Sequence, residues 1–495
     1  MEDDSTARVV ALVCQVSESV ADPDAIRLDD ELRDLGITSL LLIQLITQLE
    51  EEFDLELTEG DLLPSNFHTV GTTVRLVEAR QNGSSERLAP RRSAAAAAEP
   101  TANPLPRVST PSRWSDLPVE ARLLLSTARL DMAPDHVDLA TAILQDRGLD
   151  WGAFLDLATR NRVLAVVARN FDRKHLGPLG TVRRSTLRAA YLYNRGRHQA
   201  TLAEWRSVFA LLRERGISAV ARKGAYLANH VYPDPALRYM EDLDLYVTDE
   251  ELPALVEALS DLGYQQGSDS PDRRQVVPLQ RETAVFWQLN VAALPPFLRP
   301  TSDPYIDVFS IDVRRDLMEP ASGKSVPAKA FLARARTTQI GGEEVLVPGN
   351  EDMLLDIAVH LHREATTLSS IHAGKDLVLL RFLDVALWVR HTADALDWDV
   401  LERAIDEHGL AEELYFALHC TDEVFPGVID TAALARFRPA DLDYLDAYGT
   451  LDGQPARWGD EFLSRLADRH RSARVVGRSA LPRPRVQWTD DHGGR

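Results

Sequence analysis

Residues 221–247 read ARKGAYLANHVYPDPALRYMEDLDLYV, and this stretch decides the fold of the larger part of the 495-residue chain. It overlaps the short apolar strand candidate ISAVA at 217–221. Residues 225–232 then predict a short helix, which a Tyr-Pro-Asp-Pro turn ends. From 237 to 247 apolar and polar side chains alternate, which indicates a strand with one buried face.

Two carboxylates on this predicted strand suggest chemistry. Asp242 and Asp244 are two residues apart, so both side chains leave the same face of the strand. Two adjacent carboxylates repel each other, and Mg²⁺, which takes oxygen ligands, relieves that repulsion. A third carboxylate on a neighbouring strand would complete a two-metal site for phosphoryl or nucleotidyl displacement.

The alternating stretch 304–317, PYIDVFSIDVRRDL, supplies that third carboxylate as Asp312 or, in another register, as Asp307. Close to the pair, Gly224 would let the backbone approach a phosphate, and Lys223 could neutralise developing charge. A D-x-D pair by itself is more often a solvated strand face than a site.

The combination of these features resembles the uncharacterised nucleotidyltransferase family of the polymerase-beta-like superfamily, over about residues 115–430. The family pattern of Lys-Gly, Tyr-Pro-x-Pro, Arg and Asp-x-Asp corresponds here to Lys223, Gly224, Tyr232, Pro233, Pro235, Arg238, Asp242 and Asp244. The resemblance implies that Asp242, Asp244 and Asp312 are catalytic and ligate metal. It also implies that Lys223, Gly224 and Arg238 bind the nucleotide.

Two departures from the family pattern qualify this resemblance. The wider superfamily has Gly-Ser or Gly-Gly where this chain has Lys223 and Gly224. Arg314 and Arg315 occupy the places of a family His and Trp. These arginines either hold a triphosphate or an acidic partner, or are exposed strand residues.

Three further polar residues lie on predicted helices. His360 and His362 are two residues apart, so they point to different sides and lack the spacing of a helical zinc pair. We expect His360 to make a structural contact with Asp356 or Glu364. Asp384 lies in the apolar helix LRFLDVALWVRH and, as a buried carboxylate, needs a partner, for which an arginine is the expected choice.

The start of the chain has a different pattern. SLLLIQLITQLEEEFDLEL at 39–57 places Leu42, Leu45, Ile46, Leu49 and Phe53 on one apolar stripe of a helix. Helices at about 5–20 and 70–80 complete a small acidic bundle. Ser39 stands at the N-cap position of the central helix, and by local spacing it is a capping residue.

The segment LRDLGITSLLLIQLITQLEEEF, with the later FHTVGTTVRLVEA, resembles the signature of acyl and peptidyl carrier proteins, over roughly residues 5–80. Ser39 then takes the place of the serine that receives 4′-phosphopantetheine from a phosphopantetheinyl transferase. Thr38 stands where many acyl carriers have Asp. A helix start suits phosphate chemistry, and the acidic residues at 50–54 would offer charge to a basic partner enzyme.

Charge and composition divide the chain. Residues 1–80 hold 18 acids and 5 arginines, whereas the whole chain has a net charge of −21. The Ala-, Pro- and Ser-rich stretch after them predicts a linker. We therefore expect a multidomain protein: an all-α four-helix carrier bundle at 1–81, a flexible linker at 82–113, an α+β nucleotidyltransferase-like domain with helical flanks at 114–471, and a loose basic tail at 472–495.

Composition also limits location and partners. The acidic balance argues against nucleic acid and anionic membranes as partners. There is no long apolar run and no signal peptide pattern, and two cysteines form no disulfide framework, so we expect a cytoplasmic protein.

Together, the two resemblances predict a carrier-fused nucleotidyltransferase. It would transfer NMP from an NTP, with Mg²⁺ in a two-metal site, to an acceptor carried on or loaded onto the phosphopantetheine arm, in specialised-metabolite biosynthesis. One alternative is a catalytically silent scaffold that recruits or orients the carrier. Another is a sensor that binds a nucleotide without transferring it.

Overall fold

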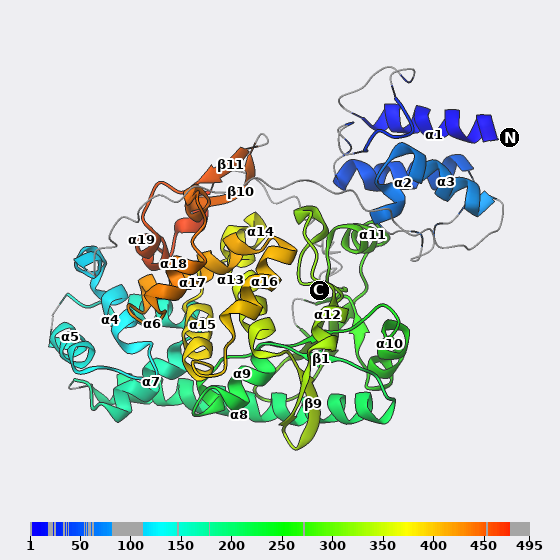
Figure 1. Cartoon of the computed structure of the whole chain (residues 1–495). Helices are drawn as coiled ribbons and strands as arrows, with labels where there is room; N and C mark the ends of the chain where they lie inside the picture. Colours follow the sequence, from blue (N-terminus) through cyan, green and yellow to red (C-terminus); the bar gives the residue numbers. More distant parts are fainter. Residues whose placement is uncertain are drawn as a thin grey trace, which may run out of the picture. The chain divides into compact units, whose positions relative to one another are not determined.

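The computed structural model describes residues 2–17, 23, 26–32, 35, 37, 39–53, 55, 57, 61, 64–81, 112–145, 148–177, 179–270, 273–451 and 454–475. The chain forms two compact units, whose elements Figure 1 labels. Unit 1 comprises residues 1–109, 279–294 and 319–323, and unit 2 comprises the rest. Most of the predicted linker and tail, together with Gly36 and Thr38, lie outside the described residues.

Unit 1 is helical. Its elements are α1 (Glu2–Val16), α2 (Ser39–Phe53), the 3₁₀ helix η2 (Pro64–Phe67), α3 (Val70–Gln81), α11 (Arg281–Asn290) and the 3₁₀ helix η5 (Pro320–Ser322). The predicted helices near 5–20, 39–57 and 70–80 correspond to α1, α2 and α3, and α2 ends at Phe53, before the predicted end. Because the described part of 1–81 has three α-helices and one short 3₁₀ helix, the four-helix bundle stays a prediction.

The core of unit 1 follows the apolar stripe of α2. Leu45, Ile46 and Leu49 are fully or almost fully buried, and Phe53 is 7% exposed. The same cluster includes three residues of α11, which are Val285, Phe286 and Leu289. An ion pair between Glu50 and Arg281 joins α2 to α11 as well, so part of the acidic end of α2 has a basic partner within this unit.

Unit 2 is built on a seven-stranded mixed sheet in the order β3-β6-β7-β2-β1-β9-β8. Its strands are β1 (Val220–Ala221), β2 (Asp242–Tyr246), β3 (Gln265–Gln266), β6 (Phe297–Pro300), β7 (Val308–Arg314), β8 (Arg336–Ile340) and β9 (Glu343–Val347). Two small hairpins are β4 (Ser268–Asp269) with β5 (Val276–Val277), and β10 (Ala447–Leu451) with β11 (Gln454–Arg457). The predicted strands at 217–221, 237–247 and 304–317 all form but are shorter than the sequence pattern, with strand structure over 220–221, 242–246 and 308–314.

Helices surround this sheet. Those before it are η3 (Ser112–Asp116), α4 (Val119–Thr127), α5 (Pro134–Gln145), α6 (Trp151–Arg160), α7 (Leu164–Arg173) and α8 (Thr181–Glu214). Those between the strands are α9 (Gly224–His230), η4 (Pro235–Leu237), α10 (Leu252–Asp261) and α12 (Ala328–Ala333). Those after β9 are α13 (Asn350–Thr366), α14 (Leu368–His372), α15 (Leu379–His391), α16 (Trp398–His408), α17 (Ala411–Val424), α18 (Thr431–Arg436), η6 (Asp443–Asp446), α19 (Phe462–Ala467) and η7 (Arg471–Arg474).

These helices provide the helical flanks that the sequence predicts. The 34-residue α8 runs along one side of the unit, as Figure 1 shows, and contacts η4 and β9. On the other side α13, α15 and α17 pack on one another. At the end of the described chain, buried Arg471 pairs with buried Asp376, so the described residues up to 475 remain attached to this unit.

No helix among the described residues has both the length and the apolar character needed to cross a membrane.

Candidate active site

The pairing of β2 with β7 brings three carboxylates onto neighbouring strands. The two strands are parallel, and their register sets Asp244 opposite Asp312 and Asp242 opposite Ser310. Asp307, the other candidate for the third carboxylate, lies before β7 with its side chain 70% exposed and 3.9 Å from Arg273. The structure therefore brings Asp312, and not Asp307, to the pair.

Burial and mutual repulsion make two of these carboxylates reluctant to ionise. Burial, followed by the neighbouring Asp244 and Asp312, raises the pKa of Asp242 to about 7. Burial and Asp244 likewise raise the pKa of Asp312. Neither Asp242 nor Asp312 forms a side-chain hydrogen bond or ion pair with another described residue.

Asp244 differs because two cations face it. Lys223 Nζ lies 3.3 Å from Asp244 Oδ1, and Arg222 Nη1 lies 3.7 Å from the same oxygen. Burial alone would raise the pKa of Asp244, but Lys223 and Arg222 outweigh burial and lower it. Burial and Arg222 in turn lower the pKa of Lys223 to about 8.

The backbone at Lys223 is strained. Its φ is +41° and its ψ is −110°, a region that non-glycine residues rarely adopt. Such strain persists where surrounding structure over-determines it, and it clusters at functional sites. Here the strained residue is Lys223, which precedes α9 and contacts Asp244 of β2.

Arg222 is a residue that sequence reasoning missed. It is fully buried, its Nε donates to Asp356 at 2.8 Å, and its guanidinium lies 4.0 Å from the ring centre of Tyr246. Tyr246 also donates to Asp356 at 3.3 Å. The partners are 134 residues apart in the chain, so no local pattern could indicate this contact, although Arg222 directly precedes the Lys-Gly motif.

A second buried ion pair involves Arg238. Its Nε and Nη2 donate to Asp384 at 3.0 and 2.8 Å, and the Tyr232 hydroxyl donates to Asp384 at 2.8 Å. The expected arginine partner of Asp384 is thus Arg238. The same pairing places the Arg238 guanidinium in a structural ion pair, so phosphate binding by Arg238 stays a prediction.

The Arg238 guanidinium fills the space next to Gly224. A Cβ atom added there would lie 2.6 Å from Arg238 Nη1. The close approach that Gly224 allows in this structure is therefore to a guanidinium, and its predicted approach to phosphate remains untested.

Arg314 and Arg315 are not simple exposed strand residues. Arg314 is 6% exposed, and its Nε donates to the backbone oxygen of Asp316 at 3.1 Å. Arg315 Nη1 lies 3.8 Å from Asp249. Neither contact involves one of the three carboxylates.

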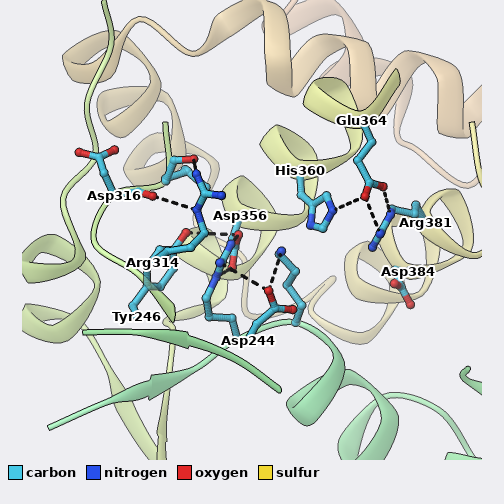
Figure 2. Close-up of polar contacts among 12 residues, drawn as sticks. Asp244, Tyr246, Arg314, Asp316, Asp356, His360, Glu364, Arg381 and Asp384 are labelled. Carbon is cyan, nitrogen blue, oxygen red and sulfur yellow. Dashed lines mark hydrogen bonds and ion pairs between the residues drawn. The ribbon is translucent and has the colours of Figure 1, made fainter. Parts of the chain in front are cut away.

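A line of charged groups lies beside Asp244 on α13 and α15, as Figure 2 shows. His360 Nε2 is 2.9 Å from Glu364, as the sequence led us to expect, and Arg381 Nη2 donates to Glu364 at 2.9 Å. Burial, Arg381 and Lys223 keep the pKa of His360 well below its usual range. The ring of His362 instead lies 5.2 Å from that of Phe416.

The donor set of the carboxylate cluster fits a hard divalent cation. Asp242, Asp244 and Asp312 supply carboxylate oxygens, which Mg²⁺ prefers. Burial, followed by the neighbouring carboxylates, raises the pKa values of Asp242 and Asp312. Within the described part of the chain, however, no three His, Cys, Asp or Glu side chains are already arranged around a metal position. Metal binding would thus need side-chain adjustment or substrate oxygens.

The candidate attachment residue lies in unit 1. Ser39 is the first residue of α2, at the helix start that the sequence predicts.

Comparison with known proteins finds two family matches. Residues 147–426 match the family described as "Uncharacterised nucleotidyltransferase", and residues 7–77 match "Phosphopantetheine attachment site". The first match covers more than half of the chain and contains all three carboxylates. The second contains Ser39.

Two curated relatives of this chain are carrier proteins by name. Aminoacyl carrier protein 2 of Bradyrhizobium diazoefficiens is 30% identical over 70 residues, which are 14% of this chain and 79% of the relative. Aminoacyl carrier protein 1 of the same organism is 31% identical over 70 residues, which are 14% of this chain and 78% of the relative.

Proposed function

The chain belongs to the uncharacterised nucleotidyltransferase family and carries a phosphopantetheine attachment domain, and on that premise we propose that it is a carrier-fused nucleotidyltransferase. Unit 2 would transfer NMP from an NTP to an acceptor on, or destined for, the phosphopantetheine arm. The observation that carries the proposal is the register that sets Asp244 opposite Asp312, with Asp242 two residues from Asp244.

The carboxylates would hold the nucleotide through metal. Asp242, Asp244 and Asp312 are the proposed ligands, and Mg²⁺ bound there would neutralise phosphate charge and orient the α-phosphate. In the reaction a nucleophilic oxygen or nitrogen of the acceptor would bond to the α-phosphorus, the bond from that phosphorus to the β-bridging oxygen would break, and pyrophosphate would leave. Asp312 is the candidate to take the proton of a hydroxyl acceptor.

The neighbouring cations would hold negative charge. Lys223 is in contact with Asp244, so it is well placed to neutralise charge on a phosphate bound there. Arg222 donates a hydrogen bond to Asp356, which fixes its guanidinium. This suits a role for Arg222 in positioning Lys223 and Asp244. Predicted phosphate contacts of Gly224 and Arg238 belong to the same proposal.

The carrier part would supply the acceptor. Ser39 is the proposed attachment residue for 4′-phosphopantetheine, which a phosphopantetheinyl transferase would install. The aminoacyl carrier names of the two relatives suggest an amino acid as one cargo. Its carboxylate would then be adenylated before thioester formation, whereas tagging a hydroxyl or amine of a tethered intermediate is the other version. Either version belongs to specialised-metabolite biosynthesis in the cytoplasm.

Calorimetric titration tests the nucleotide part directly. The full chain is titrated with each NTP, with and without Mg²⁺, beside the Asp242→Asn/Asp244→Asn variant and an Asp307→Asn control. We expect metal-dependent binding of one NTP, lost in the double variant and kept in the control, whose carboxylate lies in solvent.

The scaffold alternative has two observations in its favour. Lys223 already neutralises Asp244, and the described residues contain no prearranged metal cluster. Absence of binding for every NTP, by a folded chain whose Ser39 still accepts phosphopantetheine, would contradict nucleotidyl transfer and favour the scaffold.

A further inference from the structure

Unit 2 has a cavity formed by α7, α8 and the turn that precedes η4. Its volume is about 860 Å³, within the range of small-molecule sites. Its lining contains none of Asp242, Asp244, Asp312 and Lys223, so it is separate from the candidate active site.

Five arginines line this cavity, which we call the arginine pocket. They are Arg169, Arg173, Arg184, Arg188 and Arg195. Two aspartates, Asp172 and Asp234, also line it, so its formal charge is +3 in a chain of net charge −21. An excess of positive charge is thus concentrated on one site of an acidic protein.

The two aspartates form no ion pair with the five arginines, although Asp234 acts electrostatically on Arg169. Asp234 accepts a hydrogen bond from the Tyr191 hydroxyl at 2.6 Å and another from the backbone N–H of Ala236 at 3.0 Å. Among the described residues, Arg173, Arg184, Arg188 and Arg195 form no ion pair with any carboxylate. Arg184 and Arg188 are one helical turn apart on α8, so their side chains share a face.

Like charges at this spacing repel each other, and an anion relieves the repulsion. Burial, followed by the nearby Arg173, lowers the pKa of Arg169, while Asp131 and Asp234 oppose the shift. Planar guanidinium groups bind phosphate oxygens with two parallel hydrogen bonds, which makes arginine the suitable residue for a phosphate ester.

The lining of the arginine pocket also includes apolar side chains. Ala168, Phe171, Leu176 and Leu187 line it and are buried. A ligand that occupies the pocket can therefore contact guanidinium groups through its charged part and hydrocarbon side chains through its apolar part.

We propose that the arginine pocket binds a small phosphate ester, with its phosphate or diphosphate group on the arginines and an apolar portion against Phe171 and Leu187. The pocket shares no residue with the three-carboxylate cluster, so this ligand site is independent of the nucleotidyl transfer proposed above.

The test uses the full chain carrying Asp242→Asn/Asp244→Asn, in EDTA and 150 mM salt, which removes metal-dependent binding at the candidate active site. The probes are inorganic pyrophosphate, isopentenyl diphosphate as a diphosphate with an apolar tail, and hexaglutamate as an acidic peptide. In that background Arg184→Ser/Arg188→Ser is compared with Arg206→Ser/Arg213→Ser. The latter removes two arginines of the same helix that do not line the pocket.

We expect saturable binding of one equivalent of pyrophosphate and tighter binding of isopentenyl diphosphate. Loss of a charge-assisted hydrogen bond weakens binding by roughly tenfold or more, so the Arg184/Arg188 variant should show at least that loss and the control variant none. Arg173→Ser, from α7, should weaken binding in the same direction and guards against misfolding of the double variant.

Four results would overturn the proposal. They are no saturable binding, equal loss in both double variants, equal affinity for the two diphosphate probes, and displacement of pyrophosphate by hexaglutamate at similar concentration. The last would identify the arginine cluster as an acidic-peptide surface.

Discussion

Asp244 on β2 lies directly opposite Asp312 on the parallel strand β7. Lys223 and Arg222 face Asp244, whereas Asp312 has no cation paired with it and a raised pKa. The two carboxylates thus lie on neighbouring strands but differ in their charge environment; with Asp242 they are the residues that would hold a divalent cation.

Replacing Asp312 tests its role as a metal ligand. Asp312→Asn should weaken the Mg²⁺-dependent part of NTP binding by about tenfold or more, because a neutral amide replaces a carboxylate that the cation needs. Asp307→Asn, at the exposed residue just before β7, should leave the Mg²⁺-dependent part of NTP binding unchanged. Calorimetry at several Mg²⁺ concentrations measures the effect, and equal behaviour of the two variants would remove Asp312 from the site.

The Arg238–Asp384 pair should matter for stability. Asp384→Asn leaves a buried guanidinium without its counter-charge, and such breakage costs about 3–5 kcal/mol. Adding Arg238→Gln should recover part of that loss, because the uncompensated charge disappears. Urea unfolding of both single variants and the double variant measures the coupling, and strictly additive losses would contradict the pairing.

Gly224 should tolerate no side chain. Gly224→Ala places a Cβ atom 2.6 Å from Arg238 Nη1, which the ion pair with Asp384 holds in place, and overpacking of this kind costs about 1–3 kcal/mol. Gly180→Ala is the matched control, since nothing lies within 4 Å of a Cβ there. Thermal unfolding compares them, and a similar midpoint for both would show that Arg238 moves freely.

Ser39 should be the single site of carrier modification. Incubation with coenzyme A and a broad-specificity phosphopantetheinyl transferase should add the mass of one phosphopantetheine to the wild-type chain and none to Ser39→Ala. Intact-protein mass spectrometry gives the result. A modified Ser39→Ala chain would move the attachment elsewhere, while an unmodified wild type would leave Ser39 as a helix cap.

Protonation of His362 should weaken the fold in mild acid. Burial lowers the pKa of His362 to about 4, with Glu413 opposing and Lys324 adding to the shift. The native state therefore favours the neutral ring, and the stability that depends on it is present above pH 6.5 and lost as the pH falls toward 4.

The expected loss from His362 between pH 8 and pH 5 is about 1–2 kcal/mol, allowing for its partial exposure. His362→Leu should flatten the pH dependence of the unfolding free energy by that amount, whatever its stability at pH 8. Denaturant unfolding at the two pH values measures the difference, and an unchanged slope would show that the ring is protonated freely in the native state.

The sequence by itself determined the elements and their motifs. The apolar stripe of α2 and the alternation in β2 are local patterns, because each follows from the period of one helix or strand. They indicated a helix near the start of the chain and a strand that presents Asp242 and Asp244 on one face. The carrier region and the nucleotidyltransferase-like domain followed from the resemblance of the Ser39 segment and of the Lys-Gly to Asp-x-Asp order to known families.

Tertiary structure alone decided which residues meet. The choice of Asp312 over Asp307 follows from the β2–β7 register, which no single strand specifies. Arg222 with Asp356 and Arg238 with Asp384 are pairs 134 and 146 residues apart. Burial makes such ion pairs obligatory, since an unpaired buried charge is costly, but the choice of partner depends on how α13 and α15 pack against the sheet.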